Sequence, residues 1–242
     1  MQPGLIPNVS VDCVVFGFDL TNLDVLLIER KFTIKGIVYN DLKLPGDLIR
    51  INEDLDDAAI RILNEETGLG NLELKQFGSF DSPNLLKQKK RDLEWLQQKD
   101  RTKEHLITIA YYSLIDMTQQ GSAAFSINDT VRFCPVNEVS YMVMDHMDIL
   151  KGAPAHLRVE ILSHPVAFGL LPEKFTLSQM QKLYEVILEK TFDKRNFRKK
   201  FANMKYLIPL NEKEVGVAHS PARFYFFSRE EYTKIMNDNM GN

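Results

Sequence analysis

The sequence predicts an α+β protein of two domains, and three observations support this prediction. In the first 150 residues, apolar runs with strand character precede and follow one amphipathic helix. Residues 164–242 contain two further amphipathic helices and then two strand-like runs. This second region holds 13 Lys/Arg against 9 Asp/Glu, a net charge of +4, whereas the rest holds 17 against 24, a net charge of −7. An acidic body joined to a basic tail suggests a polyanionic partner for the tail.

The bulk composition is that of a soluble globular chain. Its 242 residues allow one large domain or two small ones, and 44% of them are hydrophobic. No run of about 18 apolar residues could cross a membrane, and the first ten residues lack the features of a signal peptide. Cys13 and Cys134 have no metal-site spacing, so we expect buried reduced thiols rather than a bridge. We therefore expect a cytoplasmic protein with no membrane partner.

The first domain is predicted from its strand pattern. Residues 11–30 read as two strands joined by a turn around Asp19 to Asn22. The first of these runs is apolar on both faces, as in a strand covered on both sides. Further strands are expected over residues 36–44, 72–80, 106–115 and 131–136. One predicted helix interrupts this series of strands, and its sequence indicates what kind of domain this is.

That helix lies in the stretch from Leu44 to Leu69. Its apolar residues recur at i, i+3, i+4, i+7 and i+8, which is one stripe of an α-helix. They are Leu55, Ala58, Ala59, Ile62 and Leu63. Asn52 or Asp54 can cap its start, and Gly68 follows its last residues as a C-terminal glycine should.

The same stretch resembles the Nudix box, the pattern G-x5-E-x7-R-E-U-x-E-E-x-G-U, in which U is aliphatic. The matching residues are Glu53, Arg61, Leu63, Glu65, Glu66, Gly68 and Leu69. In the Nudix family the helix carboxylates hold Mg²⁺ or Mn²⁺ on a nucleoside diphosphate. The resemblance implies a Nudix α/β/α sandwich over residues 8–150, and the order of predicted strands and helices fits it.

Two positions depart from the box. The leading glycine falls on Asp47, one residue past Gly46, and the glutamate after the arginine is Ile62. Mg²⁺ requires oxygen ligands in near-octahedral geometry, so the loss of one carboxylate is expected to weaken or abolish metal binding and hydrolysis. Glu65 and Glu66 would be the ligands of any Mg²⁺ that still binds. We expect no required cofactor.

Two segments near the edges of this domain have open interpretations. Residues 83–104 form an insertion with seven Lys/Arg and four Asp/Glu. It can be a solvated helix or a flap, with Trp95 as its anchor, or it can help to recognise a ligand. Residues 143–162 read as a helix broken near Pro154, so that residues 151–163 form a connector helix. Within the same segment, Asp145 and His146 suggest a structural hydrogen-bonding pair rather than part of a catalytic triad.

Residues 164–242 have the pattern of a helix-turn-helix. Thr176 or Ser178 can cap a first helix, in which apolar residues recur at helical spacing. Asp193 can cap a second helix up to about residue 207, with Phe197 and Phe201 facing inward together with Met204. Strands expected at 210–217 and 222–227, around a loop with His219, Ser220 and Arg223, would form a wing. The outward face of the second helix carries Lys194, Arg195, Asn196, Arg198, Lys199 and Lys200.

The segments FTLSQMQKLYEVI, DKRNFRKKF and PARFYFF resemble the winged-helix tail of the Nudix-related transcriptional regulators. The resemblance implies a winged helix-turn-helix over residues 164–242 and a homodimer that binds double-stranded operator DNA. In that family the Nudix domain senses ADP-ribose or a sugar such as arabinose, and the ligand loosens DNA binding. We therefore expect a ligand-responsive regulator, a repressor. The expected DNA-binding residues are Lys194, Arg195, Asn196, Arg198, Lys199, Lys200, His219 and Arg223.

Two other classes of protein remain open. The first is a Nudix pyrophosphohydrolase for an ADP-ribose-like substrate, in which Glu53, Arg61, Glu65 and Glu66 still serve and Asp47 replaces the missing carboxylate. The second is an RNA-binding or scaffold protein that uses the basic tail without sequence preference. Hydrolysis in the presence of Mg²⁺ would identify the first, and an affinity that depends on salt but hardly on sequence would identify the second.

Overall fold

The computed structural model describes residues 4–82, 106–118, 130–218 and 220–240. Its first part contains β1 (Leu5–Phe18), β2 (Leu23–Ile34), β3 (Ile37–Lys43), β4 (Gly46–Arg50), α1 (Leu55–Thr67), β5 (Lys75–Ser82), β6 (Leu106–Asp116), β7 (Val131–Pro135), η2 (Val136–Glu138) and α3 (His146–Ser163). Its second part contains η3 (Pro165–Leu170), β8 (Phe175–Thr176), α4 (Leu177–Leu188), α5 (Lys194–Phe201), β9 (Leu207–Lys213), β10 (Arg223–Phe227) and α6 (Arg229–Met240). The insertion at 83–104, with Trp95, and His219 of the predicted wing lie outside the described residues.

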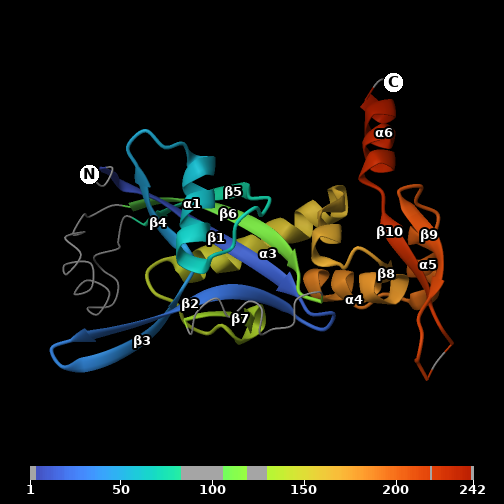
Figure 1. Ribbon diagram of the computed structural model, residues 1–242, viewed down its shortest axis with the longest axis horizontal. Coiled ribbons are helices and arrows are strands. Elements are labelled where there is room, and N and C mark those ends of the chain that lie inside the picture. The colour runs from blue at the N-terminus through green and yellow to red at the C-terminus, as the bar shows by residue number, and fades with distance from the viewer. Residues whose placement is uncertain (1–3, 83–105, 119–129, 219, 241–242) are drawn as a thin grey trace.

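The first part is built on a mixed seven-stranded sheet. Its main order is β3-β2-β1-β6-β5, and β4 and β7 pair with β1 and β2. The central strand β1 runs parallel to β6 and antiparallel to β2 and β4. Because neighbouring residues of a strand point to opposite faces, Val14 and Phe16 join the core beneath α3, whereas Cys13 and Val15 join the core beneath α1. The expected α/β/α sandwich is confirmed (Figure 1).

The second part packs against one end of this sandwich (Figure 1). Helices α4 and α5 are followed by β9 and β10, and β8 completes a three-stranded sheet of order β8-β10-β9. Phe175, Met180 and Phe197 belong to the same apolar core as Ile149 and Leu157 of α3. The core is therefore continuous between the two parts, and α3 provides the surface on which they meet.

Several details differ from the sequence-based expectation; among them, the first strand of the wing, β9, spans Leu207–Lys213 rather than 210–217. Helix α3 is not broken: it runs through Pro154, because its buried side chains Ala153 and Leu157 fix its path in the core. Helix α5 ends at Phe201 rather than near residue 207. There the side-chain amide of Asn203 donates to the carbonyl oxygen of Lys199, 3.0 Å away, and competes with the continuing helix. The elements β4, β8 and α6 were not predicted; Tyr232 in the first turn of α6 packs on Tyr206 and Phe227, and the C-terminal end of this helix projects from the rest of the chain (Figure 1).

Other expectations agree with the structure. Cys13 is buried and Cys134 partly buried, and both are free thiols. Asp54, the second of the two proposed caps, accepts from the backbone N–H of Asp57 at 2.8 Å. Gly68 ends α1 with a φ of 70°, a left-handed conformation that favours glycine. No helix in the described ranges is long and apolar enough to span a membrane.

Candidate ligand cleft and nucleic-acid interface

Arg61 and Glu53 of the box form a tight bidentate ion pair. The guanidinium nitrogens lie 2.6 and 2.8 Å from the two carboxylate oxygens, and both side chains are 13% exposed. Arg61 also donates to the carbonyl oxygen of Leu48 at 3.2 Å. The hydrogen bonds from Arg61, together with the backbone N–H of Arg50, hold the pKa of Glu53 below its usual value. This pair ties the start of α1 to its second turn and to strand β4.

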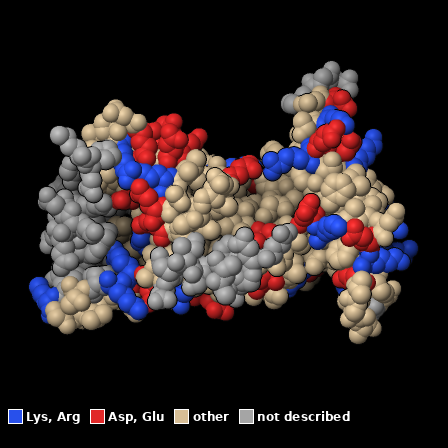
Figure 2. All heavy atoms as spheres, in the orientation of Figure 1, with Lys and Arg blue, Asp and Glu red and all other residues tan. Residues whose placement is uncertain are grey.

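The two remaining box glutamates also have cationic partners. Glu65 accepts from Arg50 at 2.8 Å and from Arg61 at 3.2 Å. Glu66 accepts from the ammonium group of Lys43, at 2.5 and 2.8 Å to its two oxygens, and from the backbone N–H of Gly46 at 2.8 Å. Figure 2 shows adjoining basic and acidic patches on this side of the domain. The charges of the box are therefore satisfied within the protein.

Ile62 faces the core instead of this charged cluster. Its side chain is 1% exposed and packs with Ala59 and Val15 between α1 and the sheet. The structure thus brings Glu53, Arg61 and Glu65 together, as the box predicts, and places Glu66 with Lys43 beside them. Lys43 and Arg50 were missed by the sequence reasoning, because they lie on β3 and β4, outside the helix pattern.

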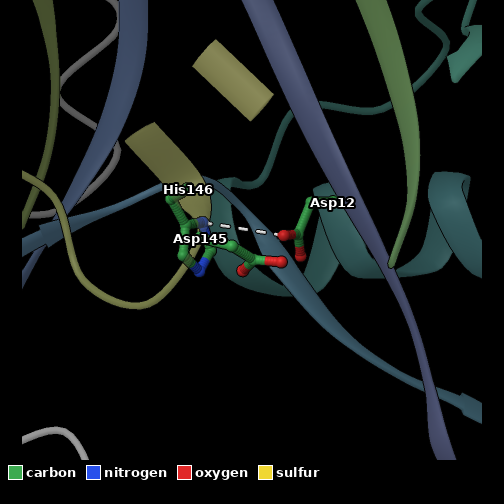
Figure 3. A group of neighbouring side chains, drawn as sticks. All are labelled: Asp12, Asp145 and His146. Carbon is green, nitrogen blue, oxygen red and sulfur yellow. Dashed lines mark ion pairs between the residues drawn. The ribbon is translucent and has the colours of Figure 1, made fainter. Parts of the chain in front are cut away.

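Asp12, Asp145 and His146 form a second, fully buried group between β1 and the start of α3 (Figure 3). Their ligand atoms lie within 4.8 Å of one another, which is close enough to hold a metal ion. However, the His146 Nδ1 that faces Asp12 at 3.7 Å already accepts the backbone N–H of Leu44 at 3.2 Å. Its lone pair is therefore occupied, and the group is better described as a structural junction.

Burial sets the protonation of this junction. Desolvation, helped by Lys43 and Arg30, lowers the pKa of His146 to about 3, so its imidazole is neutral at pH 7. Desolvation and the neighbouring Asp145 raise the pKa of Asp12 well above its usual value. The imidazole of His146 faces Asp12 and Leu44, which are distant in sequence; the expected hydrogen bond between Asp145 and His146 stays a prediction.

Helices α4 and α5 form the predicted helix-turn-helix. Thr176 caps α4 in a capping box with Gln179, and Asp193 caps α5 by accepting from the N–H of Asn196 at 2.9 Å. The inward side chains Phe197 and Phe201 are buried against Tyr184, with ring centroids 5.7 and 5.0 Å away. The apolar side of α5 therefore fixes which of its residues face solvent.

The polar residues predicted for DNA binding lie on the exposed side of α5. They are Lys194, Arg195, Asn196, Arg198, Lys199 and Lys200. Arg198 donates to the hydroxyl of Ser178 at 3.3 Å, and Lys200 lies 5.4 Å from the ring centroid of Phe201. Within the described ranges, none of the α5 cations forms an ion pair with a carboxylate. The wing residue Arg223 is exposed on β10 opposite Lys213, so this surface is positively charged and available for binding.

A cavity of about 720 Å³ lies between the two parts of the chain. Tyr112 of β6 and His164 after α3 line it from one side, and Phe227 and Tyr232 from the other. At its rim Arg229 of α6 pairs with Glu73 at 3.6 Å. The cavity would change shape with any movement of the second part relative to the first.

Family models match both parts of the chain. The model described as the NUDIX domain matches residues 7–152, and the model described as the NrtR DNA-binding winged helix domain matches residues 167–227. A relative from Acinetobacter baylyi, the ADPR responsive transcriptional repressor NtrR, is 26% identical over 230 residues. That alignment covers 93% of this chain and 84% of the relative.

Solved structures show the same two-part fold. Shewanella oneidensis NrtR, solved in complex with a 27mer DNA, has a TM-score of 0.70 and 23% identity, covering 93% of this chain and 95% of that one. A MutT/nudix family protein from Enterococcus faecalis has a TM-score of 0.62 and 20% identity, covering 94% and 89%. The Nudix model matches more than half of the chain, so the chain belongs to the Nudix family, and a winged helix domain of the NrtR type follows its Nudix domain.

Proposed function

We propose that the protein is a ligand-responsive transcriptional repressor that binds operator DNA as a homodimer through α5 and the wing. The observation that carries the proposal is the contrast in charge pairing. The box glutamates are bonded to cations of the same chain, whereas the cations of α5 lack carboxylate partners within the described ranges. A polyanion such as double-stranded DNA would supply those partners. The proposal implies a cytoplasmic protein, because its DNA lies there.

The exposed side of α5 divides into two roles. Arg195, Asn196 and Arg198 are the proposed base readers, because Arg and Asn can bond bidentately to guanine and adenine in the major groove. Lys199 and Lys200 are the proposed phosphate contacts, which position the helix without reading sequence. Lys194 and Arg223 would extend the contact along the sugar-phosphate backbone of the DNA; His219, predicted for the same surface, lies outside the described residues. In a homodimer the two helices would meet half-sites about 34 Å apart, or a multiple of that distance.

We propose that the Nudix domain is not catalytic and requires no cofactor. A Mg²⁺ ion would need several carboxylate or water oxygens in near-octahedral geometry. Instead Ile62 is buried, Glu65 is held by two arginines, and Glu66 is held by Lys43. The ammonium group of Lys43, which also donates to the carbonyl oxygen of Gly46 at 3.0 Å, supplies the positive charge next to Glu66. The residues present do not fit a hydrolytic metal site.

The proposed effector site is the surface of the Nudix domain around Arg61 and Glu65; the 83–104 insertion, which the sequence suggests as a further part of it, lies outside the described residues. The Acinetobacter relative is named for its response to ADPR, and the altered box is also compatible with a sugar. A ligand there would change the spacing of the two winged helices in the dimer. Because both half-sites must be met together, a modest rotation would weaken DNA binding by about 5–150-fold, the usual range for coupling between two sites.

Two assays test this proposal. Duplex DNA from upstream of the protein's own gene should bind specifically, and a screen of ADP-ribose, related nucleotides and pentoses should find one saturable thermal stabiliser. A ligand at about 100 times its Kd adds roughly 2.7 kcal/mol to stability. That compound should also release the duplex. Turnover of ADP-ribose with Mg²⁺, abolished in Glu66→Gln, together with no duplex binding, would contradict the proposal.

A further inference from the structure

The turn between β3 and β4 is attached on both sides to elements with different roles. On one side, the ammonium group of Lys43 and the backbone N–H of Gly46 donate hydrogen bonds to the carboxylate of Glu66, near the end of α1. On the other side, the backbone N–H of Leu44 donates to His146 Nδ1 at 3.2 Å. The residue before the turn, Leu42, accepts from the N–H of Val143 at 3.1 Å. Residues 42–46 therefore join the box helix to the first turn of α3.

This turn has no room to move independently of its neighbours. Asp12 of β1 is in register with Gly46, and a Cβ atom on Gly46 would lie 1.8 Å from the Asp12 carboxylate. The N–H of Cys13 donates to the carbonyl oxygen of Pro45 at 2.8 Å. The side chain of Leu44 is fully buried. A displacement of the turn would thus be passed to His146 rather than absorbed locally, because close-packed interiors transmit strain.

Helix α3 connects this junction to the winged helix. Its buried residues Ile149, Leu150 and Leu157 fix it along the core. Near its far end, Arg158 donates to the carbonyl oxygen of Ile187 at 2.8 Å and pairs with Glu189, both at the end of α4.

From there a short polar network reaches the start of α5. Glu185 of α4 accepts from the backbone N–H of Phe192 at 2.9 Å, and Gln181 donates to the carbonyl oxygen of Phe192 at 2.8 Å. The next residue, Asp193, is the cap of α5. Bonded or packed contacts therefore run without a gap from the box to the helix proposed to read DNA.

We infer that Lys43 and His146 are positioning residues that couple the charged cluster of the Nudix box to the winged helix, with the Lys43–Glu66 pair as the contact that a ligand alters. The inference rests on the proposed function and names its route of regulation. A ligand carrying an anionic group would compete with Glu66 for the ammonium of Lys43. The released turn would then no longer hold His146, and α3 would shift at its first turn.

Hydrogen–deuterium exchange of the full-length protein tests the coupling without needing the effector. Lys43→Met removes the ammonium group and keeps an unbranched side chain. We expect amide exchange to rise in the turn and also at residues 143–150 and 185–193, by about 5-fold or more, the lower end of usual coupling. The matched control is Lys31→Met, which removes a lysine paired with Glu29 on β2. In this control, any rise in amide exchange should be confined to β2 and β3.

Replacement of His146 tests the route. His146→Asn keeps an acceptor for the N–H of Leu44, whereas His146→Leu removes it. Adding Lys43→Met should still raise exchange at residues 185–193 in the Asn variant and should have no further effect there in the Leu variant. If His146→Leu fails to fold, Arg158→Met is used in its place, because it breaks the route at a partly exposed position near the end of α3. If Lys43→Met fails to fold, Glu66→Gln is used in its place, because it weakens the same ion pair and keeps the size of the side chain.

The outcomes separate the coupling from the proposed function. Exchange that rises only within residues 42–50 and α1, with α3 and α4 unchanged, would overturn the coupling. A wild-type protein that binds no upstream duplex would overturn the proposed function, while the exchange data would still decide the coupling. If both stand, Lys43→Met should change the Kd for that duplex by about 5-fold or more, and Lys31→Met should leave it unchanged.

Discussion

Helices α1 and α5 are both rich in charge, yet they use it in opposite ways. On α1 the box glutamates Glu65 and Glu66 are matched by Arg50, Arg61 and Lys43, at distances between 2.5 and 3.2 Å. On α5 the cations extend into solvent and, in the described ranges, form no ion pair. Paired charges beside a partly buried turn stabilise a local conformation, whereas a row of unpaired cations costs repulsion until an anionic partner arrives. The comparison therefore distinguishes α1, whose charges stabilise the fold, from α5, whose charges are proposed to bind DNA.

The largest expected effect comes from the inward face of α5. Phe197→Ala should destabilise the winged helix by about 3–5 kcal/mol, because it removes a buried aromatic ring that packs on Phe201, with ring centroids 4.3 Å apart, and on Tyr184. Urea unfolding followed by circular dichroism measures the change. On the outward face Lys194→Ala should change stability by less than about 0.5 kcal/mol. Equal effects from the two variants would show that the inward and outward faces are wrongly assigned.

Arg195→Ala comes next, because it removes a proposed base reader without touching the core. We expect a loss of about 1–3 kcal/mol in operator affinity and weaker discrimination between sequences. Fluorescence anisotropy with the upstream duplex and a scrambled duplex measures both quantities. Arg50→Ala, which removes a cation paired with Glu65 of the box, is the matched control. An unchanged operator affinity in Arg195→Ala would remove the assignment.

A smaller effect is expected from the pH dependence of the box. The pKa of Glu53 is held below its usual value by Arg61. A carboxyl group whose pKa is lower in the folded state stabilises the fold above its unfolded pKa, and this contribution is lost as the pH falls through the folded value. Glu53→Gln should therefore be less stable than the wild type at pH 7, and the difference should shrink below about pH 4.5. If the stability of the two proteins differed by the same amount at every pH, the Glu53–Arg61 pair would not contribute to the pH dependence of stability.

The smallest predicted change concerns salt. Lys199→Ala should lower the slope of log Kd against log salt concentration by about 1, since one phosphate contact is lost. Lys174→Ala provides a control within the same part of the chain, because Lys174 is already paired with Glu212 at 2.8 and 2.9 Å. Its slope should match that of the wild type. If both variants lower the slope equally, pairing with a carboxylate does not distinguish binding cations from structural ones.

Much of this architecture could be predicted from local sequence patterns. The stripe of α1, its Asp54 cap and its Gly68 end are all set within one stretch of chain, and so are the caps of α4 and α5. Patterns of this kind depend on helical spacing and on residues three or four positions apart, which the sequence displays directly. The inward and outward faces of α5 follow from the same spacing.

The parts that were missed depend on contacts between distant segments. Lys43 meets Glu66 only because β3 and β4 are folded beside the end of α1, and Leu44 meets His146 across 102 positions. The burial of Ala153 and Leu157 explains why α3 continues through Pro154, which local propensity disfavours. A single sequence gives no direct sign of such pairings.

The central claim is that an exposed cationic helix reads DNA while a charge-satisfied Nudix module does not catalyse. The most direct test is the affinity of the wild-type protein for duplex DNA from upstream of its own gene, measured at physiological salt against a scrambled duplex of equal length. We predict specific binding at least about 10³-fold tighter than binding to the scrambled duplex. Equal affinity for the two duplexes, or no binding to either, would contradict the account.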